Sequence, residues 1–243
     1  LPVQGYTMNN SLSLNTATAI INIFVSPQDT IHWLREKRSF LAPLTLVVGS
    51  GLGLYLWYFY IVDYPWMIRG LIDAMGDIPI DEAETVEKTY ESLSLKMMTI
   101  TTCLSAVIFP IIISLIQASY LSLASSLNGS SVSFRHWFSL VTWNALPGLL
   151  IVVTGIVNIL LAEGGRVSLL ELNSLSFSNL GLSVQDDPAL RSMLDSLNLT
   201  SIWSLGLLAF GYQQWTSIAG PVAFFIVSAP YALVFGVWAA FVI

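Results

Sequence analysis

The chain has 243 residues, of which 55% are hydrophobic and 10% are charged, and its formal net charge is −6. Soluble domains carry roughly 25% charged residues, so this composition excludes an ordinary soluble domain and indicates a membrane protein. The length suits one helical bundle without a separate soluble enzyme domain. With a single cysteine, Cys103, no disulfide forms within the chain. The negative charge comes from two loops and therefore says nothing about nucleic acid, which is not expected as a partner of this membrane protein.

Two short helices are expected before the first apolar stretch. Residues 1–7 look like an artificial leader, with Met8 as a plausible natural start. Residues 8–39 then form an N-terminal segment outside the bilayer. Within this segment, the pattern over 13–25 predicts a short amphipathic helix.

The second short helix is predicted over residues 27–38. Ser26 suits the N-cap, Pro27 suits the first helical position, and Asp29 completes a capping box. The basic run 35–38 ends this helix, which is typical of a helix lying on the membrane surface. The alternative is a disordered basic tail.

Long apolar stretches without charge predict five membrane-spanning helices, because crossing a bilayer core about 30 Å thick takes roughly 20 apolar residues. The expected spans are residues 40–62, 97–120, 137–161, 201–218 and 221–242, and a polar Ser/Asn/Gly linker is expected over 122–133. The last two spans share one apolar region, whose length as a single helix would be about twice the thickness of the bilayer core. The expected fold class is therefore all-α. Residues 40–243 form a bundle of five transmembrane helices, preceded by an amphipathic interfacial helix.

The first span carries a pair of small residues that permits close helix packing. Gly49 and Gly53 are four residues apart, so they lie on one face of the helix. The span ends in a cluster of aromatic residues, as is typical of a membrane interface. We therefore expect Gly49 and Gly53 to contribute to helix packing.

Both long loops, 63–96 and 162–200, are acidic. The first has eight Asp or Glu against three Lys or Arg. Three aspartates recur every four residues and would share one helix face that binds a cation: Asp73, Asp77 and Asp81. Gly76 and Pro79 interrupt such a helix, so a solvated acidic loop is favoured and no metal site is predicted. A short helix is expected over 187–197.

The distribution of basic residues predicts the orientation. Arg35, Lys37, Arg38 and Arg135 flank the spans on one side of the membrane. On the other side, five basic residues are diluted by thirteen acidic ones. By the positive-inside rule, the N-terminal segment is cytoplasmic and, with five spans, the C-terminus lies outside.

The same basic residues are candidates for binding anionic lipid headgroups. Arg35, Lys37 and Arg38 end the interfacial helix, and Arg135 with His136 begins the third span on the same side. Basic residues at this position attract anionic lipids. For His136, the alternative is an ordinary interfacial anchor.

Uncharged polar residues inside the spans are candidates for a cavity. Asn144, Thr142, Gln117 and Thr101 are expected to line it, and Asn144 lies one turn before Pro147. The alternative is that they form hydrogen bonds between helices, worth about 0.6 kcal/mol each. The predicted span interiors contain no charged residue, which argues against an ion-coupled pump.

Three stretches resemble one family. Ser26-Pro27-x-x-Thr30 precedes the basic helix, Phe134-Arg135-His136-Trp137 precedes a span with Leu146-Pro147, and the fourth span begins around Ile202–Gly211. Together they resemble bacterial members of the Yip family, the Ypt-interacting proteins, whose eukaryotic relatives bind Rab-type GTPases. The resemblance covers roughly residues 20–243. It implies a five-span bundle, a cytoplasmic N-terminus, no known catalytic residues and a place in the bacterial inner membrane.

The functional hypothesis is a non-catalytic integral membrane protein of the Yip type. It acts through membrane interaction or scaffolding, with anionic lipids, a second copy or another membrane protein as partner. The Rab-binding role is not carried over, since the N-terminal segment is short for docking a GTPase. The alternative is a channel or facilitator for a small polar solute or lipid, through a cavity between proline-kinked spans. An intramembrane enzyme is disfavoured, because no catalytic pair stands out, and no cofactor is expected.

Overall fold

The structure is a computed structural model, and it describes residues 14–73, 85, 88–89, 92, 94–182 and 188–242. Within these residues the chain is helical, and the only strand-like feature is an isolated bridge between Ser176 and Asn198. The helices are α1 (Thr16–Val25), α2 (Pro27–Lys37), α3 (Leu41–Ile61), α4 (Tyr64–Asp73), α6 (Leu95–Leu127), α7 (Phe134–Asn144), α8 (Leu149–Leu161), α9 (Pro188–Ser196), α10 (Leu199–Thr216) and α11 (Gly220–Val242). Short 3-10 turns are η1 (Leu146–Gly148), η2 (Glu163–Gly165) and η3 (Glu171–Asn173).

Four helical stretches in the described part of the chain are long and apolar enough to cross a membrane. They are Leu41–Ile61, Leu95–Leu127, Phe134–Leu161 and Gly220–Phe241. Helix α10 has 18 residues but is not among them, because polar side chains such as Gln213 and Gln214 lower its apolarity. The prediction of an all-helical protein with membrane-spanning helices is confirmed.

Polar side chains start several helices. The Asn15 side chain accepts the Thr18 backbone N–H at 2.8 Å before α1, and Asn198 accepts that of Ser201 at 2.8 Å before α10. The predicted capping box at α2 is wrong in detail. The Ser26 hydroxyl donates to the Asp29 carboxylate at 2.6 Å instead of capping the backbone, while Pro27 does stand in the first turn.

Two proposed loops contain helix instead. Helix α4 lies within the acidic loop 63–96, where the Asp63 carboxylate accepts the Trp66 backbone N–H at 3.2 Å. Helix α6 continues to Leu127, through residues expected to form a polar linker. The serines there remain helical because their hydroxyls donate to backbone carbonyls one turn earlier, as Ser126 does to Ser122 at 2.8 Å.

Prolines affect the helices unequally. Pro147 lies in η1, which separates α7 from α8, because proline removes a helix hydrogen bond and crowds the preceding turn. Pro110 in α6 and Pro230 in α11 lie within continuous helices. The third predicted span is therefore a helix broken near its middle.

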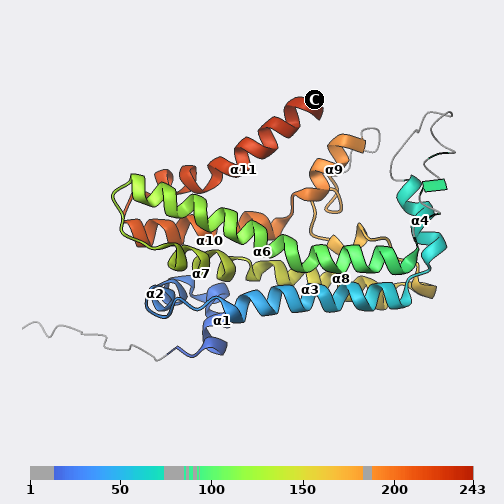
Figure 1. Cartoon of the computed structure of the whole chain (residues 1–243), viewed down its shortest axis with the longest axis horizontal. Coiled ribbons are helices and arrows are strands. Elements are labelled where there is room, and N and C mark those ends of the chain that lie inside the picture. The colour runs from blue at the N-terminus through green and yellow to red at the C-terminus, as the bar shows by residue number, and fades with distance from the viewer. Residues whose placement is uncertain are drawn as a thin grey trace, which may run out of the picture.

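Most long helices lie lengthwise along the molecule (Figure 1). Helices α3, α6, α8 and α10 run along the long axis, and α11 diverges from them towards the C-terminus. Helices α1 and α2 lie at one end of the bundle, and α4 lies at the other. The helix pairs α10 with α11, α3 with α6, and α6 with α7 pack together.

Two separate clusters of buried apolar residues hold the bundle together. One, called the aromatic core here, joins α1, α2, α7, α10 and the ends of α6 and α11; its large members include Trp137, Trp143, Tyr212 and Trp215. The other lies towards the α4 end and contains Leu54, Tyr58, Met67, Ile159 and Leu172. In the second cluster, the Tyr58 hydroxyl donates to the Val167 carbonyl at 2.9 Å.

Candidate functional site

Helix α7 is the centre of the aromatic core. All of its residues from Trp137 to Asn144 are buried. The Trp137 ring stacks on Tyr212 with 5.0 Å between ring centroids, and its indole N–H donates to the Ser125 hydroxyl at 3.0 Å. The sequence placed Trp137 at the start of a span, but the structure places its side chain in the protein interior.

Helix α2 is fixed to the bundle by hydrogen bonds near its middle and just beyond its C-terminal end. The Trp215 indole N–H donates to the Ile31 carbonyl at 3.2 Å. Just beyond α2, the Ser39 carbonyl accepts the Ser139 hydroxyl at 2.6 Å and the Trp143 indole N–H at 2.7 Å. These bonds attach α2 to α7 and α10, so the charged end of α2 has a defined position.

The candidate headgroup residues gather at this end of the molecule. The side chains of Arg35, Lys37, Arg38 and Arg135 are exposed, whereas His136 is half-buried. His136 interacts electrostatically with Arg38 and forms a hydrogen bond with the Arg35 backbone. These two interactions connect the start of α7 to the end of α2. Its Nδ1 lies 2.7 Å from the Ser133 hydroxyl. We call these five residues the basic end.

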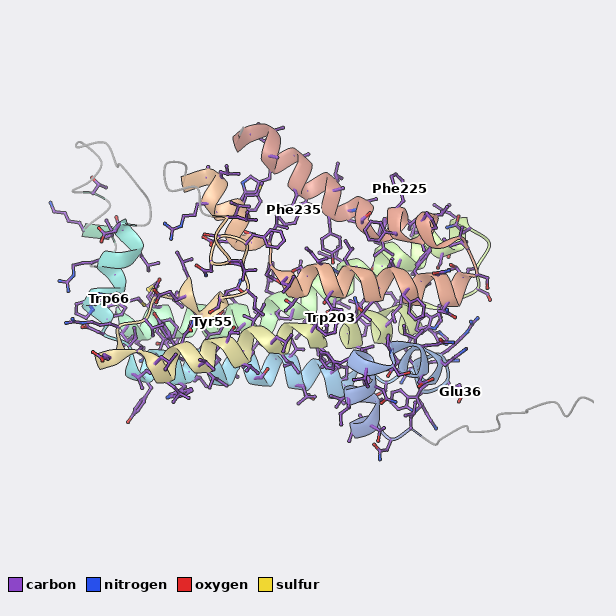
Figure 2. The ribbon with its side chains drawn as sticks, turned by 180° about the vertical axis from the view of Figure 1, so that it is seen from behind. Glu36, Tyr55, Trp66, Trp203, Phe225 and Phe235 are labelled. Carbon is purple, nitrogen blue, oxygen red and sulfur yellow. The ribbon has the colours of Figure 1, made fainter. Side chains whose placement is uncertain are left out.

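Two acidic residues accompany the basic end. They are Asp29 and Glu36, both exposed on α2, and Figure 2 shows Glu36 pointing away from the bundle. Among the residues that the structure describes, Arg35, Lys37, Arg38 and Arg135 form no ion pair with a carboxylate. Their charges are therefore available to ligands outside the chain.

The other end of the bundle has an ion pair. The Arg166 Nε lies 3.4 Å from the Asp63 carboxylate, and the Asp63 backbone N–H donates to the Gly165 carbonyl at 3.0 Å. Arg166 has 64% of its side chain exposed, so the pair is screened by water. These contacts connect the end of α3 to the turn after α8.

A cavity of about 260 Å³, called the polar cavity here for the amides and hydroxyls among its mostly apolar lining, lies between α6, α7, η1, α8, α10 and α11. Of the four predicted cavity residues, Asn144 and Gln117 line it together. Thr142 is buried with its hydroxyl on the Ser139 carbonyl at 2.9 Å, and Thr101 is exposed with its hydroxyl on the Met97 carbonyl at 3.0 Å. Neither threonine is among the cavity-lining residues.

The two amides of the cavity differ in their hydrogen bonding. Gln117 donates to the Tyr231 hydroxyl, and Asn144 donates from its amide nitrogen to the Ser204 carbonyl. The Asn144 side-chain oxygen is buried and has no hydrogen-bond partner among the described residues. A buried acceptor without a partner is rare in proteins.

Several residues of this cavity were not predicted from the sequence: Ser114, Asn198, Thr200, Ser204 and Tyr231. The first four lack a distinguishing pattern, since serine, threonine and asparagine also cap helices. Tyr231 offers a usable signal, because the hydroxyl of a tyrosine inside an apolar span needs a hydrogen-bond partner. The tertiary arrangement, not local sequence, brings these residues together.

Gly49 and Gly53 lie on the outer face of α3. An added methyl group at either position would meet nothing within 4 Å in this chain. The two glycines thus make no close helix contact within the described residues. Leu46 and Leu56, exposed on the same helix, lie one turn to either side of the pair.

The acidic residues considered for a cation give no site. Among the described residues, no group of three His, Cys, Asp or Glu side chains is arranged to hold a metal ion. Asp73 is exposed at the end of α4, while Asp77 and Asp81 lie outside the described residues. The expected 187–197 helix corresponds to α9 at Pro188–Ser196, and Asp187 lies outside the described residues.

The fold defines an integral membrane protein of the all-helical class, because long apolar helices with exposed apolar faces make up most of the described chain. The Yip1 domain family model matches residues 21–241. The chain therefore belongs to the Yip1 domain family, and the predicted Yip resemblance is confirmed. Comparisons with curated proteins and with solved structures gave no match.

Proposed function

We propose that this Yip1 domain protein is a non-catalytic membrane protein whose basic end docks on anionic lipid headgroups. The observation that carries the proposal is the set of four exposed cations at one end of the bundle, two of them on the hydrogen-bonded α2 and a third, Arg38, directly after it. Docking of this kind lets a membrane protein organise lipids or partner proteins around itself. A second copy of the chain or another membrane protein is the further partner we expect, through the outer face of α3.

The proposal includes the orientation and the five-span count. Helix α10 would be the fourth span, paired with α11 as the fifth. The basic end would then face the cytoplasm, with the N-terminal segment, and the C-terminus would lie outside. The proposal also includes a location in the bacterial inner membrane, which the resemblance to bacterial Yip proteins implies. The positive-inside rule supports this orientation, because basic residues within about 20 residues of a span are retained on the cytoplasmic side.

The magnitude of docking follows from the charge. Each Lys or Arg near an anionic surface is worth about 1 kcal/mol, so Arg35, Lys37 and Arg38 together contribute about 3 kcal/mol. Every 1.4 kcal/mol changes a binding constant tenfold. Replacing all three by glutamine should therefore weaken binding of an anionic lipid by about a hundredfold.

A direct test is native mass spectrometry of the whole protein with added dioleoyl phosphatidylglycerol or dioleoyl phosphatidylcholine. The unaltered protein should bind the anionic lipid more tightly, and Arg35→Gln/Lys37→Gln/Arg38→Gln should remove that preference. The charge-matched control replaces the exposed residues Arg69, Lys96 and Arg166 by glutamine. Equal loss of preference in both triple variants would refute docking at the basic end.

The channel or facilitator alternative is supported by one observation, the polar cavity with Asn144 and Gln117. The aromatic core argues against it, because Trp137, Tyr212 and Trp215 are packed at 5.0 and 5.3 Å between the cavity and the basic end. Uptake of a small solute such as glycerol into vesicles containing the protein distinguishes the two. Protein-dependent uptake that Asn144→Leu abolishes would favour the facilitator.

A further inference from the structure

Arg38 has a backbone conformation that residues other than glycine rarely adopt. Its φ is +50° and its ψ is +35°, in the left-handed region, where it ends α2 and turns the chain towards α3. Glycine is the usual residue at such a helix end, because a Cβ is crowded in this region. A residue with a side chain there shifts the folding equilibrium against the folded state by about fivefold or more. Strain of this kind is concentrated at functional positions.

The backbone on both sides of Arg38 is held in place. The Arg38 backbone N–H donates to the Leu34 carbonyl at 3.0 Å. The next carbonyl along the chain, that of Ser39, accepts the two donors from α7 described above. The Phe40 ring then packs against Phe138 of α7, with 5.2 Å between ring centroids. Helices α2 and α7 together therefore hold the strained conformation, and the Arg38 side chain starts from a fixed position.

The Arg38 side chain takes no part in holding this joint. It is exposed, and among the residues that the structure describes its guanidinium forms no hydrogen bond and no ion pair. Arg38 and Arg35 both interact electrostatically with His136, so positive charge gathers where α2 meets α7. A strained residue whose guanidinium has no partner in the described chain is suited to binding a ligand from outside.

Arg38 lies at the depth of lipid headgroups. Helix α3 is long and apolar enough to cross the membrane, and its exposed apolar surface begins at Leu41, which is 64% exposed. Arg38 is three residues before Leu41, so their Cα atoms are at most about 11 Å apart. The headgroup layer on each side of the hydrocarbon core is roughly 5–8 Å thick. Figure 1 shows α2 at the end of the bundle where α3 begins, which places Arg38 level with lipid phosphate groups.

We propose that Arg38 is the residue that determines specificity at the basic end, where its guanidinium binds the phosphate group of an anionic phospholipid. This inference rests on the proposed docking of anionic lipids, and it assigns to one residue most of the selectivity of that docking. A planar guanidinium donates two parallel hydrogen bonds to a phosphate, which a lysine ammonium does not. Arg35 and Lys37, in the last turn of α2, add electrostatic attraction without a fixed partner.

The test measures binding of dioleoyl phosphatidylglycerol to the whole protein by native mass spectrometry. Arg38→Ala keeps the backbone strain and should weaken binding about twentyfold, as loss of a charge-assisted hydrogen bond does. Arg35→Ala and Lys37→Ala should each weaken it by no more than about fivefold. Arg38→Lys keeps the charge and should still weaken binding about fivefold, because the second parallel hydrogen bond is lost. Binding by Arg38→Lys that equals that of the unaltered protein would overturn the proposal.

The triple glutamine variant described above separates this proposal from docking itself. If it loses the preference for the anionic lipid while Arg38→Ala loses no more affinity than Arg35→Ala, docking stands and the role of Arg38 is refuted. If the triple variant keeps the preference, both proposals fail. Inorganic phosphate should displace the lipid no better than chloride at the same ionic strength. Stronger displacement would overturn the assignment to a lipid headgroup.

A pair of glycine variants separates the side chain from the backbone. Arg38→Gly relieves the strain, so it should raise the folding equilibrium constant about threefold while weakening lipid binding as much as Arg38→Ala. Ser217→Gly is the matched control, because Ser217 is exposed, uncharged and ends α10 with a φ of +60°. It should raise stability similarly and leave lipid binding unchanged. Weaker binding by Ser217→Gly, or unchanged binding by Arg38→Gly, would overturn the proposal.

Discussion

The Ser39 carbonyl is a shared acceptor, and removing its two donors should have a more than additive effect. Ser139 donates to it at 2.6 Å and Trp143 at 2.7 Å, so either single variant leaves one hydrogen bond in place. Ser139→Ala should cost about 1 kcal/mol, the net value of one hydrogen bond. Trp143→Phe should cost about 2 kcal/mol, because the fully buried ring also becomes smaller.

The double variant removes both donors and leaves a half-buried carbonyl without these partners, which costs about 1 kcal/mol, the lower end of the range for a buried group. The expected coupling between the two substitutions is therefore about 1 kcal/mol beyond their sum. The assay is reversible unfolding in mixed micelles with increasing sodium dodecyl sulfate, followed by circular dichroism, for the four proteins of the cycle. Substitutions that add to within about 0.5 kcal/mol behave as independent sites, and that result would refute the shared acceptor.

Two further predictions concern the opposite end of the bundle. Gly165→Ala should destabilise the protein by about 2–5 kcal/mol, because its φ is +72° and an added Cβ would lie 2.1 Å from the Ile61 carbonyl oxygen. Gly164→Ala is the matched control, with a φ of +63° and open space, and should cost only about 1–2 kcal/mol in the same unfolding assay. Asp63→Asn should change stability by less than about 1 kcal/mol, since its partner Arg166 is 64% exposed; a larger effect that persists in high salt would contradict a screened pair.

The positions of most helices could be predicted from the sequence, because apolar length and helix-start residues are local signals. The first predicted span, 40–62, corresponds to α3 at Leu41–Ile61, and the last, 221–242, to α11 at Gly220–Val242. A kink at Pro147 was also expected from proline chemistry, and the structure has a 3-10 turn there that separates α7 from α8. These features need no knowledge of tertiary contacts.

Helix α4 was missed because acidic residues dominate its surroundings, although Asp63 before Tyr64-Pro65-Trp66 carries a helix-start signal. The Ser-rich end of α6 was assigned to a linker because serine favours turns, yet its hydroxyls bond to the helix itself. In both segments the amino-acid composition led to a loop prediction, although side chains that form hydrogen bonds with the helix backbone indicated a helix.

The candidate sites were predicted unevenly for a physical reason. Basic residues near span ends are visible in the sequence, so the basic end follows from charge placement alone. The cavity needs the meeting of α6, α7, α10 and α11, and only Asn144 and Gln117 of its lining stood out as amides inside apolar spans. Thr101 and Thr142 satisfy backbone carbonyls of their own helices, which a sequence pattern does not distinguish from a cavity position.

The most direct measurement of lipid docking is the association of spin-labelled phosphatidylglycerol and phosphatidylcholine with the protein in vesicles, at low and high ionic strength. Salt weakens the attraction between exposed charges and lipid headgroups, because the screening length falls from about 10 Å at 0.1 M to about 3 Å at 1 M salt. We predict a preference for phosphatidylglycerol that declines with salt and is absent in Arg35→Gln/Lys37→Gln/Arg38→Gln. A preference that is the same at both ionic strengths and in that variant would contradict docking of anionic lipids at the basic end.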